Sequence, residues 1–341
     1  MPALHHTHPK SLEGTAKNDI VVPTPDLSDT IQALRWSPVS NHLAVAAWDG
    51  KTRIYEVSKT DGETRGVAVI NAGGPLLSCD WSRDGSLVAT AGAVGKIYVL
   101  QASSGQTVPF AAHNSPIRDV RFDGSVSYCD LRNTSQPVNR IVFNGQIYSM
   151  DARGRVLAVA TDQNKVKLID LTAPTIVRHD DESPFKYQIR SLAVGIGGTG
   201  LLIGSLDGRA NATGLDPKPG ALTKQPKPIT WQCHRNPRTT TSNPVITDIY
   251  SVNAVAVHPT VKGCVATAGG DGSYRFWNVE RSTHNRSYLD VVSPITACAF
   301  DCTGLWFAYA VGYDWPKGCY HNEASIPTRL VLHRVSKDDA K

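Results

Sequence analysis

Short apolar runs recur along the chain, separated by turns rich in Gly, Asp and Asn. One sequence pattern is repeated several times: a short apolar strand, a strand of small residues, an Asp-Gly-type turn, and a strand with an aromatic residue near its end. The clearest copies are residues 43–57, 87–100, 157–171 and 264–279. Apolar runs of this length bounded by turn residues predict β-strands. Since nothing long carries a helical period, the pattern predicts an all-β protein.

The spacing of the repeats predicts a ring of small sheets. A period of about 40 to 45 residues with a degenerate Trp-Asp signature is typical of WD-type propeller blades. Seven blades of roughly 45 residues would use most of the 341-residue chain. We therefore predict an all-β fold, a seven-bladed WD40-type β-propeller, over residues 19–336. Residues 1–18 are expected to be a disordered N-terminal tail and residues 337–341 a C-terminal tail.

The two ends of the chain are expected to meet in one blade. Residues 19–25 read as an outer strand that precedes the first set of blade strands. Such a strand has its natural partner in the last blade of a closed ring. Pairing there would join the ends of the chain and leave no open sheet edge.

The third repeat is abnormally short. In the first repeat Trp36 and Asp49 are 13 positions apart, whereas the matching Phe122 and Asp123 are adjacent. The second strand of this blade is therefore missing, which leaves two explanations: a gene-model or splice defect, or a genuine blade whose gap neighbouring segments fill. Loss of a central strand would expose apolar faces on both neighbours, at a cost that could exceed the 5–15 kcal/mol net stability of a typical domain.

Composition and charge narrow the class of partner only slightly. A net charge of +5 permits binding to nucleic acid or to an acidic peptide but requires neither. The seven cysteines have no regular spacing, and the N-terminal residues lack the apolar core of a signal peptide. Together these observations predict reduced thiols in the cytosol or nucleus. The sequence contains no run of 18 apolar residues, so we predict no transmembrane helix.

Candidate chemistry is sparse. The histidines are scattered over different repeats without metal-ligand spacing, and Cys298 and Cys302 lack a second pair to complete four ligands. No nucleophile elbow, zinc-protease motif or phosphate-cradling glycine loop is present. The Asp residues that precede Gly at the blade turns are expected to accept local backbone hydrogen bonds. We predict a protein that is not an enzyme and has no cofactor or metal.

Three stretches break the repeat and combine basic with aromatic residues. Insertions between ring strands tend to lie on one face, where propellers bind. Basic and aromatic residues together suit stacking on bases with phosphate contacts, or an acidic peptide with apolar anchors. The alternative is that the aromatics only cap the ring between blades. The stretches are residues 183–191 with Lys186, Tyr187 and Arg190, residues 231–259 with Arg235 and Arg238, and residues 311–329 with Tyr313, Trp315 and Lys317.

In these stretches the sequence resembles a known family, the nuclear-pore WD-repeat mRNA export factor, or poly(A) RNA export protein. The resemblance extends from about Asp19 onward and rests on the order and spacing of several elements. These are KYQIR (186–190), SLDGR (205–209), QCHR (232–235), IYSVNAVAVHP (249–259), GGDGSYRFWN (269–278) and YDWPKG (313–318).

The resemblance implies a non-enzymatic adaptor at the nuclear pore, in the nucleus and nuclear envelope and also in the cytoplasm. Members of the family bind the GLEBS motif, a short acidic docking segment of an FG-repeat nucleoporin, and support mRNA export. By that analogy Arg235 pairs with a peptide carboxylate and Lys317 is a second basic contact, with Lys186 and Arg190 on the same peptide-binding surface. The resemblance also implies a groove for RNA or another partner, bordered by Tyr313, Asp314, Trp315, Val257 and Arg238.

Two alternatives share this fold. A sister family, the WD-repeat spindle-checkpoint protein, has similar KYQ-R, CHR and IY-VN elements but typically lacks the YDW-x-KG insertion. It implies a kinetochore adaptor that binds checkpoint-kinase GLEBS motifs and mitotic proteins. The other alternative is a module that binds mRNA or other single-stranded RNA directly.

Overall fold

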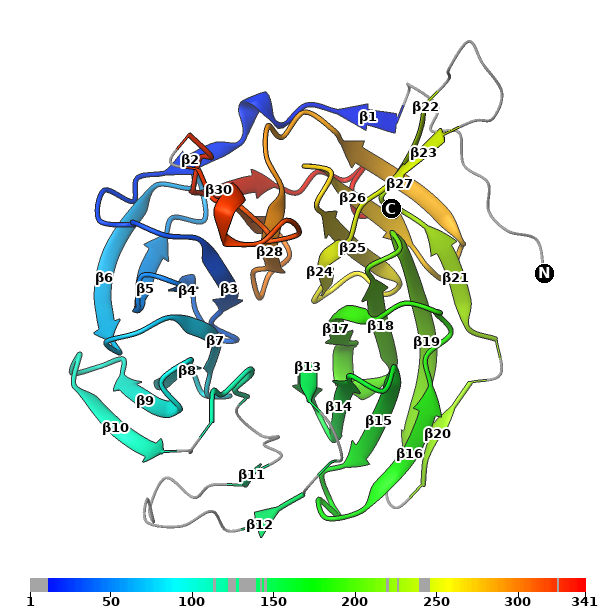
Figure 1. Cartoon of the computed structure of the whole chain (residues 1–341), viewed down its shortest axis with the longest axis horizontal. Coiled ribbons are helices and arrows are strands. Elements are labelled where there is room, and N and C mark those ends of the chain that lie inside the picture. The colour runs from blue at the N-terminus through cyan, green and yellow to red at the C-terminus, as the bar shows by residue number, and fades with distance from the viewer. Residues whose placement is uncertain are drawn as a thin grey trace.

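The computed structural model describes residues 12–112, 115–121, 127–128, 139–141, 143, 146–218, 221–225, 227–238, 246–323 and 325–341. The strands are arranged in small sheets around a central axis, with one strand of each sheet nearest the axis and the others fanning outward (Figure 1). The chain is therefore a β-propeller, as the repeats predict. Among the described residues, no helix has the length and apolar character needed to cross a membrane.

Each blade is an antiparallel sheet whose strands follow one another in sequence. We name the blades by the repeats of the sequence. Repeat one forms β3 (Ile31–Trp36), β4 (His42–Ala47), β5 (Lys51–Val57) and β6 (Thr64–Asn71). Repeat two forms β7 (Leu76–Trp81), β8 (Leu87–Gly92), β9 (Lys96–Gln101) and β10 (Thr107–Ala112). Repeat four forms β13 (Ile147–Arg153), β14 (Val156–Thr161), β15 (Lys165–Asp170) and β16 (Val177–Glu182).

Repeats five and six carry an additional strand, and repeat seven takes its fourth strand from the N-terminal part of the chain. Repeat five forms β17 (Ile189–Val194), β18 (Gly200–Ser205), β19 (Arg209–Lys218), β20 (Ala221–Lys224) and β21 (Ile229–Gln232). Repeat six forms β24 (Val252–Val257), β25 (Cys264–Gly269), β26 (Tyr274–Asn278) and β27 (Thr283–Tyr288), with β1 (Glu13–Gly14) added in parallel. Repeat seven forms β28 (Ile295–Phe300), β29 (Trp306–Val311) and β30 (Arg329–Arg334), and β2 (Ile20–Val22) completes it.

The structure has six blades, so the prediction of seven was wrong. Between β10 and β13 the described residues contain only a two-stranded ribbon, β11 (Ser127–Tyr128) with β12 (Asn139–Arg140), and no four-stranded sheet. The physical reason lies in the short third repeat, which has too few residues for four strands. Phe122 and Asp123, which mark the deletion, lie outside the described residues.

Residues 115–121, here called the third-repeat segment, span the gap between β7 and β13. Asp119 accepts a hydrogen bond from Ser78 of β7 (2.5 Å) and another from the backbone N–H of Met150 of β13 (3.1 Å). Arg121 donates to Asp119 and, over 3.2 Å, to Asp151 of β13. Polar contacts from one short segment therefore join the two neighbouring blades.

The ends of the chain meet as predicted, because Val22 of β2 pairs with Leu330 of β30. In addition to this pairing, His333 of β30 lies between Asp19 and Asp339, with Nδ1 2.7 Å from the Asp19 carboxylate and Nε2 3.3 Å from that of Asp339. Further contacts lie near both ends of the chain: Glu13–Gly14 pairs with β27, and Asp339 is fully buried.

The inner strand of each blade has a β-bulge at its second residue. The register shifts between Ile31 and Ala33 in β3, and at the matching places in β7, β13, β17, β24 and β28. A bulge leaves one residue out of the ladder and re-aims its side chain. Here the residues that the six bulges leave unpaired all line the central cavity.

Two kinds of connection emerge at the same end of the ring. The turn between the second and third strands of a blade packs against the links to both neighbouring blades. In repeat one, the backbone N–H of Trp48 donates to the Thr30 carbonyl on the link into β3 (2.9 Å), and the backbone N–H of Ala72, on the link into β7, donates to the Gly50 carbonyl (2.9 Å). We call this end the turn face. Its described residues include 48–50, 183–188, 206–208, 233–238, 246–251, 270–273, 312–323 and 325–328.

Candidate binding face

Arg235 lies on the turn face, at the start of β22 (Arg235–Arg238), which pairs with β23 (Ile246–Ile249). Gly208 makes this placement possible because it has φ of +70° and a Cβ there would stand 2.6 Å from the His234 carbonyl. Its carbonyl accepts the N–H groups of both Cys233 and His234. The β18–β19 turn is thereby fastened to the chain that leads into β22.

Asp207 orients the Arg235 guanidinium. Nε of Arg235 donates to the Asp207 carbonyl (2.8 Å), and a terminal nitrogen lies 3.3 Å from the Asp207 carboxylate. The Arg209 guanidinium lies 3.4 Å from the same carboxylate. Two guanidinium groups thus share one carboxylate, which leaves an excess of positive charge at this point of the turn face. The Arg235 side chain is 17% exposed, so it is held in place yet remains within reach of a partner.

A buried network lies directly behind Arg235. His234 contacts the Asp271 carboxylate through Nδ1 (2.8 Å) and the Thr267 hydroxyl through Nε2 (3.1 Å), and Trp277 donates to the same hydroxyl (3.1 Å). Burial lowers the pKa of His234. Burial alone would raise the pKa of Asp271, but His234 and Arg275 hold it below its usual range. This network fixes the backbone that presents Arg235.

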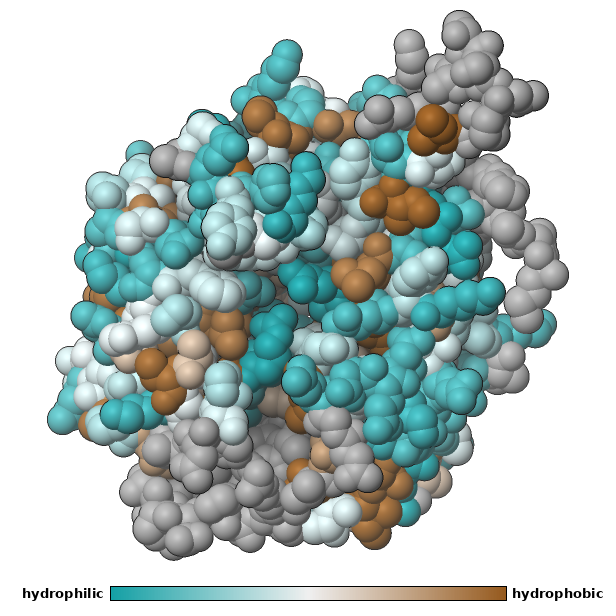
Figure 2. Space-filling view, viewed as in Figure 1, coloured by the Kyte–Doolittle hydropathy of each residue, from teal (hydrophilic) through white to brown (hydrophobic). Residues whose placement is uncertain are grey.

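Exposed apolar side chains surround this basic point. Tyr187 is 60% exposed on the link into β17, and its carbonyl lies 3.5 Å from the Ser205 hydroxyl beside the β18–β19 turn. Ile246 and Ile249 of β23 are about half exposed. Figure 2 shows hydrophobic residues near the β22–β23 ribbon on an otherwise mainly hydrophilic face. Lys186 is exposed next to Tyr187, whereas the side chain of Arg238 lies outside the described part of the structure.

The insertion between β29 and β30 forms a second part of the turn face. Trp315 stacks on Trp48 of repeat one, with ring centroids 5.3 Å apart and planes 24° from parallel, and it has φ of +63°. Tyr313 is buried and donates to the Gly318 carbonyl (2.9 Å), which closes the loop that exposes Lys317. A positive φ is uncommon for a large side chain and marks a backbone that its surroundings hold in place.

Asp314 is turned inward, toward the central axis. It is buried and accepts a hydrogen bond from Asn253 of β24 (2.8 Å), and this burial raises the pKa of its carboxyl. Asp314 therefore anchors the insertion to repeat six, and Trp315 anchors it to repeat one.

The structure brings together some of the expected residues and separates others. Lys186 and Arg235 belong to one basic and apolar group on repeat five, and Tyr313, Trp315 and Lys317 belong to the insertion. Arg190 lines the central cavity. Val257 ends β24 at the opposite end of the ring from the turn face and packs in a hydrophobic cluster with Trp231 and Val255.

Sequence reasoning passed over two contributors to this face. Arg209 belongs to the SLDGR motif, yet its place beside Asp207 depends on how that turn folds. Trp48 lies in a blade turn with the sequence Trp-Asp-Gly. The only sequence signal for a further role is that no other repeat has a tryptophan at this place in the turn.

Comparisons with known proteins agree with this architecture. Residues 23–56 match the family described as WD domain, G-beta repeat. The chain is 36% identical to the Poly(A)+ RNA export protein of Schizosaccharomyces pombe over 343 residues, covering 96% of this chain and 94% of that protein. It is 32% identical to the mRNA export factor GLE2 of Chaetomium thermophilum, covering 96% and 93%. It is also 32% identical to Protein Rae1 of Drosophila melanogaster, covering 95% and 96%.

Solved structures share the fold at low sequence identity. A structure titled "Structure of U3-55K" superposes with a TM-score of 0.72 at 17% identity, covering 94% of this chain and 99% of that one. Such a likeness shows the propeller fold alone. The identity to the export proteins extends over nearly the whole of each chain, and on that ground this chain belongs to the family of WD-repeat mRNA export factors.

Proposed function

We propose that the chain is a non-enzymatic adaptor in mRNA export that holds a GLEBS segment of an FG-repeat nucleoporin on its turn face. The names of its relatives support a role in export between nucleus and cytoplasm. The observation that carries the docking proposal is the Arg235–Asp207–Arg209 group, where two guanidinium groups share one carboxylate.

The geometry suits an acidic peptide. A guanidinium that is already oriented loses little freedom on pairing with a peptide carboxylate, and a bidentate pair adds geometric specificity. Tyr187 and Ile249 offer apolar contacts beside it, as expected for a partner that combines acidic and apolar residues. Lys186 and Lys317 are exposed, so their contacts would steer association more than they would add affinity.

A titration with a nucleoporin GLEBS peptide tests the proposal. The wild-type protein is compared with Arg235→Glu and with Arg281→Glu, which reverses an exposed arginine in the β26–β27 turn at the opposite end of the ring. We expect the wild type and Arg281→Glu to bind equally. Arg235→Glu should lose roughly 2–5 kcal/mol of binding free energy, because it places a like charge against the peptide carboxylate.

The same titration separates the alternatives. A folded wild type that does not bind the nucleoporin peptide would contradict the proposal, and so would an Arg235→Glu variant that binds as well as the wild type. Preference for a checkpoint-kinase GLEBS peptide would favour the kinetochore adaptor. Binding of single-stranded RNA without peptide, with a salt slope near −0.7 per neutralised phosphate, would favour direct RNA binding.

A further inference from the structure

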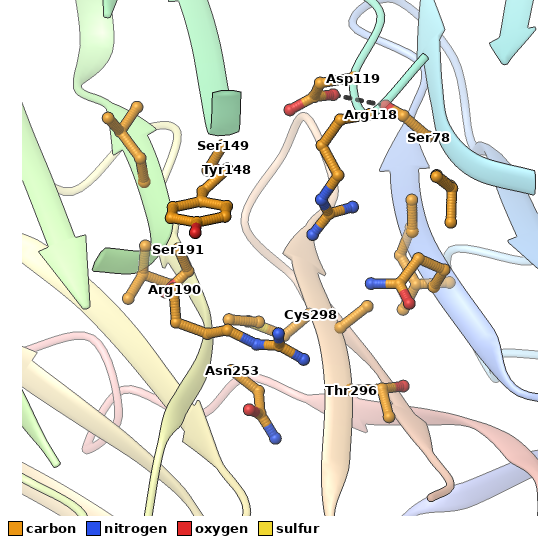
Figure 3. Close-up of a pocket in the computed structure, with 18 of the residues that line it drawn as sticks. Ser78, Arg118, Asp119, Tyr148, Ser149, Arg190, Ser191, Asn253, Thr296 and Cys298 are labelled. Carbon is orange, nitrogen blue, oxygen red and sulfur yellow. Dashed lines mark hydrogen bonds between the residues drawn. The ribbon is translucent and has the colours of Figure 1, made fainter. Parts of the chain in front are cut away.

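The central cavity contains two arginines at equivalent places in the ring. Arg190 is the residue that the bulge of β17 leaves unpaired. Arg118 lies in the third-repeat segment, where the sequence Ser115-Pro116-Ile117-Arg118 matches the sequence Ser-Pro-Ile-Thr that enters β28 and ends at its bulged residue, Thr296. Both side chains project into the cavity, from walls that repeat four separates (Figure 3).

The ring of bulge positions has a net positive charge. Besides the two arginines, its members are all neutral: Gln32, Leu77, Tyr148, Asn253 and Thr296. Within the described residues, neither Arg118 nor Arg190 forms a side-chain hydrogen bond or a salt bridge. Burial lowers the pKa of Arg190 and repulsion from Arg118 lowers it further, with Asp314 acting in the opposite sense.

The acidic groups around the cavity are engaged elsewhere. Asp119 binds Ser78 and Arg121, and Asp151 binds Arg121 and the N–H of Val194 (2.8 Å). Asp314 attracts Arg190 but is hydrogen bonded to Asn253. Arg35 also lines the cavity, 3.9 Å from both Asp80 and Asp151. Counted in this way, the arginines and carboxylates around the cavity are equal in number, yet within the described residues none of these carboxylates forms an ion pair with Arg118 or Arg190. A partly buried guanidinium group without an ion-pair partner is costly, and a bound anion reduces that cost.

Size and shape define the ligand. The cavity has a volume of about 90 Å³, well below the roughly 300–1,000 Å³ of pockets that take drug-sized ligands. Guanidinium groups that converge from two different walls suit an anion with acceptor oxygens pointing in several directions, whereas a carboxylate has acceptors at one end only. We propose that this cavity binds one small tetrahedral oxyanion of the phosphate class through Arg118 and Arg190. The site does not depend on the peptide-docking proposal.

The test measures thermal stability and heat of binding with sodium phosphate against sodium chloride at constant pH and ionic strength. The proteins are wild type, Arg118→Gln, Arg190→Gln and Arg281→Gln, the last a matched control on the opposite end of the ring. We expect the melting temperature of wild type and Arg281→Gln to rise with phosphate, as mass action requires of a ligand that binds the folded state. Each cavity variant should lose roughly tenfold or more in phosphate affinity, since each removes charge-assisted hydrogen bonds.

Stability in chloride distinguishes a ligand site from a structural role. Removing one of two positive charges that repel each other relieves that repulsion, so Arg118→Gln and Arg190→Gln should be at least as stable as wild type without phosphate. In saturating phosphate the order of stability should reverse, with the wild type more stable than either cavity variant. Adenosine monophosphate, as a second probe, separates a site for free phosphate from one that accepts the phosphate end of a monoester.

Three results would overturn the proposal. The first is a wild-type protein that binds neither phosphate nor adenosine monophosphate, even if it binds an oligonucleotide. The second is an equal phosphate response in wild type and both cavity variants, which reports general salt effects on hydration. The third is cavity variants that are equally destabilised in both buffers, which would make the arginines structural. If Arg118→Gln does not fold, Arg190→Gln and Arg190→Lys carry the comparison, with the lysine variant keeping part of the affinity.

Discussion

The ring is closed at two places by different kinds of interaction. The first, the terminal seam, lies where the two ends of the chain meet in repeat seven; the second, the third-repeat seam, lies between β7 and β13. At the terminal seam, β2 pairs with β30 along its length, and a buried cluster of Asp19, Tyr274, Tyr309, His333 and Asp339 ties the chain ends together. At the third-repeat seam, the described contacts between β7 and β13 pass through Asp119 and Arg121. The difference teaches that a missing strand can be bridged by polar contacts at the inner wall, where one segment reaches both neighbours.

The largest expected effect is at the third-repeat seam. Arg121→Ala removes the cation that Asp119 and Asp151 share, and it leaves both carboxylates partly buried without it. We expect a loss of about 3–5 kcal/mol in the free energy of unfolding, measured by urea denaturation. A loss below about 1 kcal/mol would show that the seam is held by other contacts, and the contrast between the seams would then fail.

The second prediction probes repeat six, away from both seams. Thr267→Val keeps the shape of the side chain but removes the hydroxyl that serves His234 and Trp277. Leaving these buried groups without a partner should cost about 1–3 kcal/mol. Thr247→Val, at an exposed position in β23, is the matched control and should change little. Equal effects of the two variants would refute a structural role for the hydroxyl.

The third prediction concerns pH at the terminal seam. Burial alone would lower the pKa of His333, but Asp19 and Asp339 overcome this and raise it above 6.5. The stability that the charged His333 contributes is therefore complete below about pH 6.5 and is lost as pH rises through the raised value. The difference in unfolding free energy between wild type and His333→Gln should shrink from pH 6 toward pH 9, by about 1.4 kcal/mol for each tenfold gain in proton affinity that folding gives the imidazole. A difference that does not vary with pH would exclude this linkage.

The smallest effect is expected outside both seams. Arg65 and Glu56 form an ion pair on the exposed side of repeat one, with the Arg65 side chain 76% exposed. Solvent screens such pairs, so Arg65→Ala should leave the urea midpoint unchanged within error. A clear loss would mean that surface ion pairs matter here as much as the buried pair of Arg121, and would blur the comparison.

Local patterns predicted most of the fold, with specific exceptions. The four clearest repeats each form adjacent strands of one blade, and residues 20–22 close the ring as expected. The predicted number of blades was wrong, because we counted one blade for every repeat, although the third repeat is too short to form a four-stranded sheet. The position of Val257, partly buried at the end of β24 away from the turn face, was also not predicted, since a period of two does not tell which end of a strand meets a binding face.

The sequence by itself determined the all-β class, the propeller repeat and the family, because each depends on residues close together in the chain. It also singled out Arg235 and the 313–318 insertion. Only the tertiary structure decided that Arg209 shares Asp207 with Arg235, that Trp315 stacks on Trp48, and that Arg118 and Arg190 project into one cavity. These contacts join different repeats or depend on how a turn folds, and ring closure with a bulge in every inner strand places side chains that no local pattern can position.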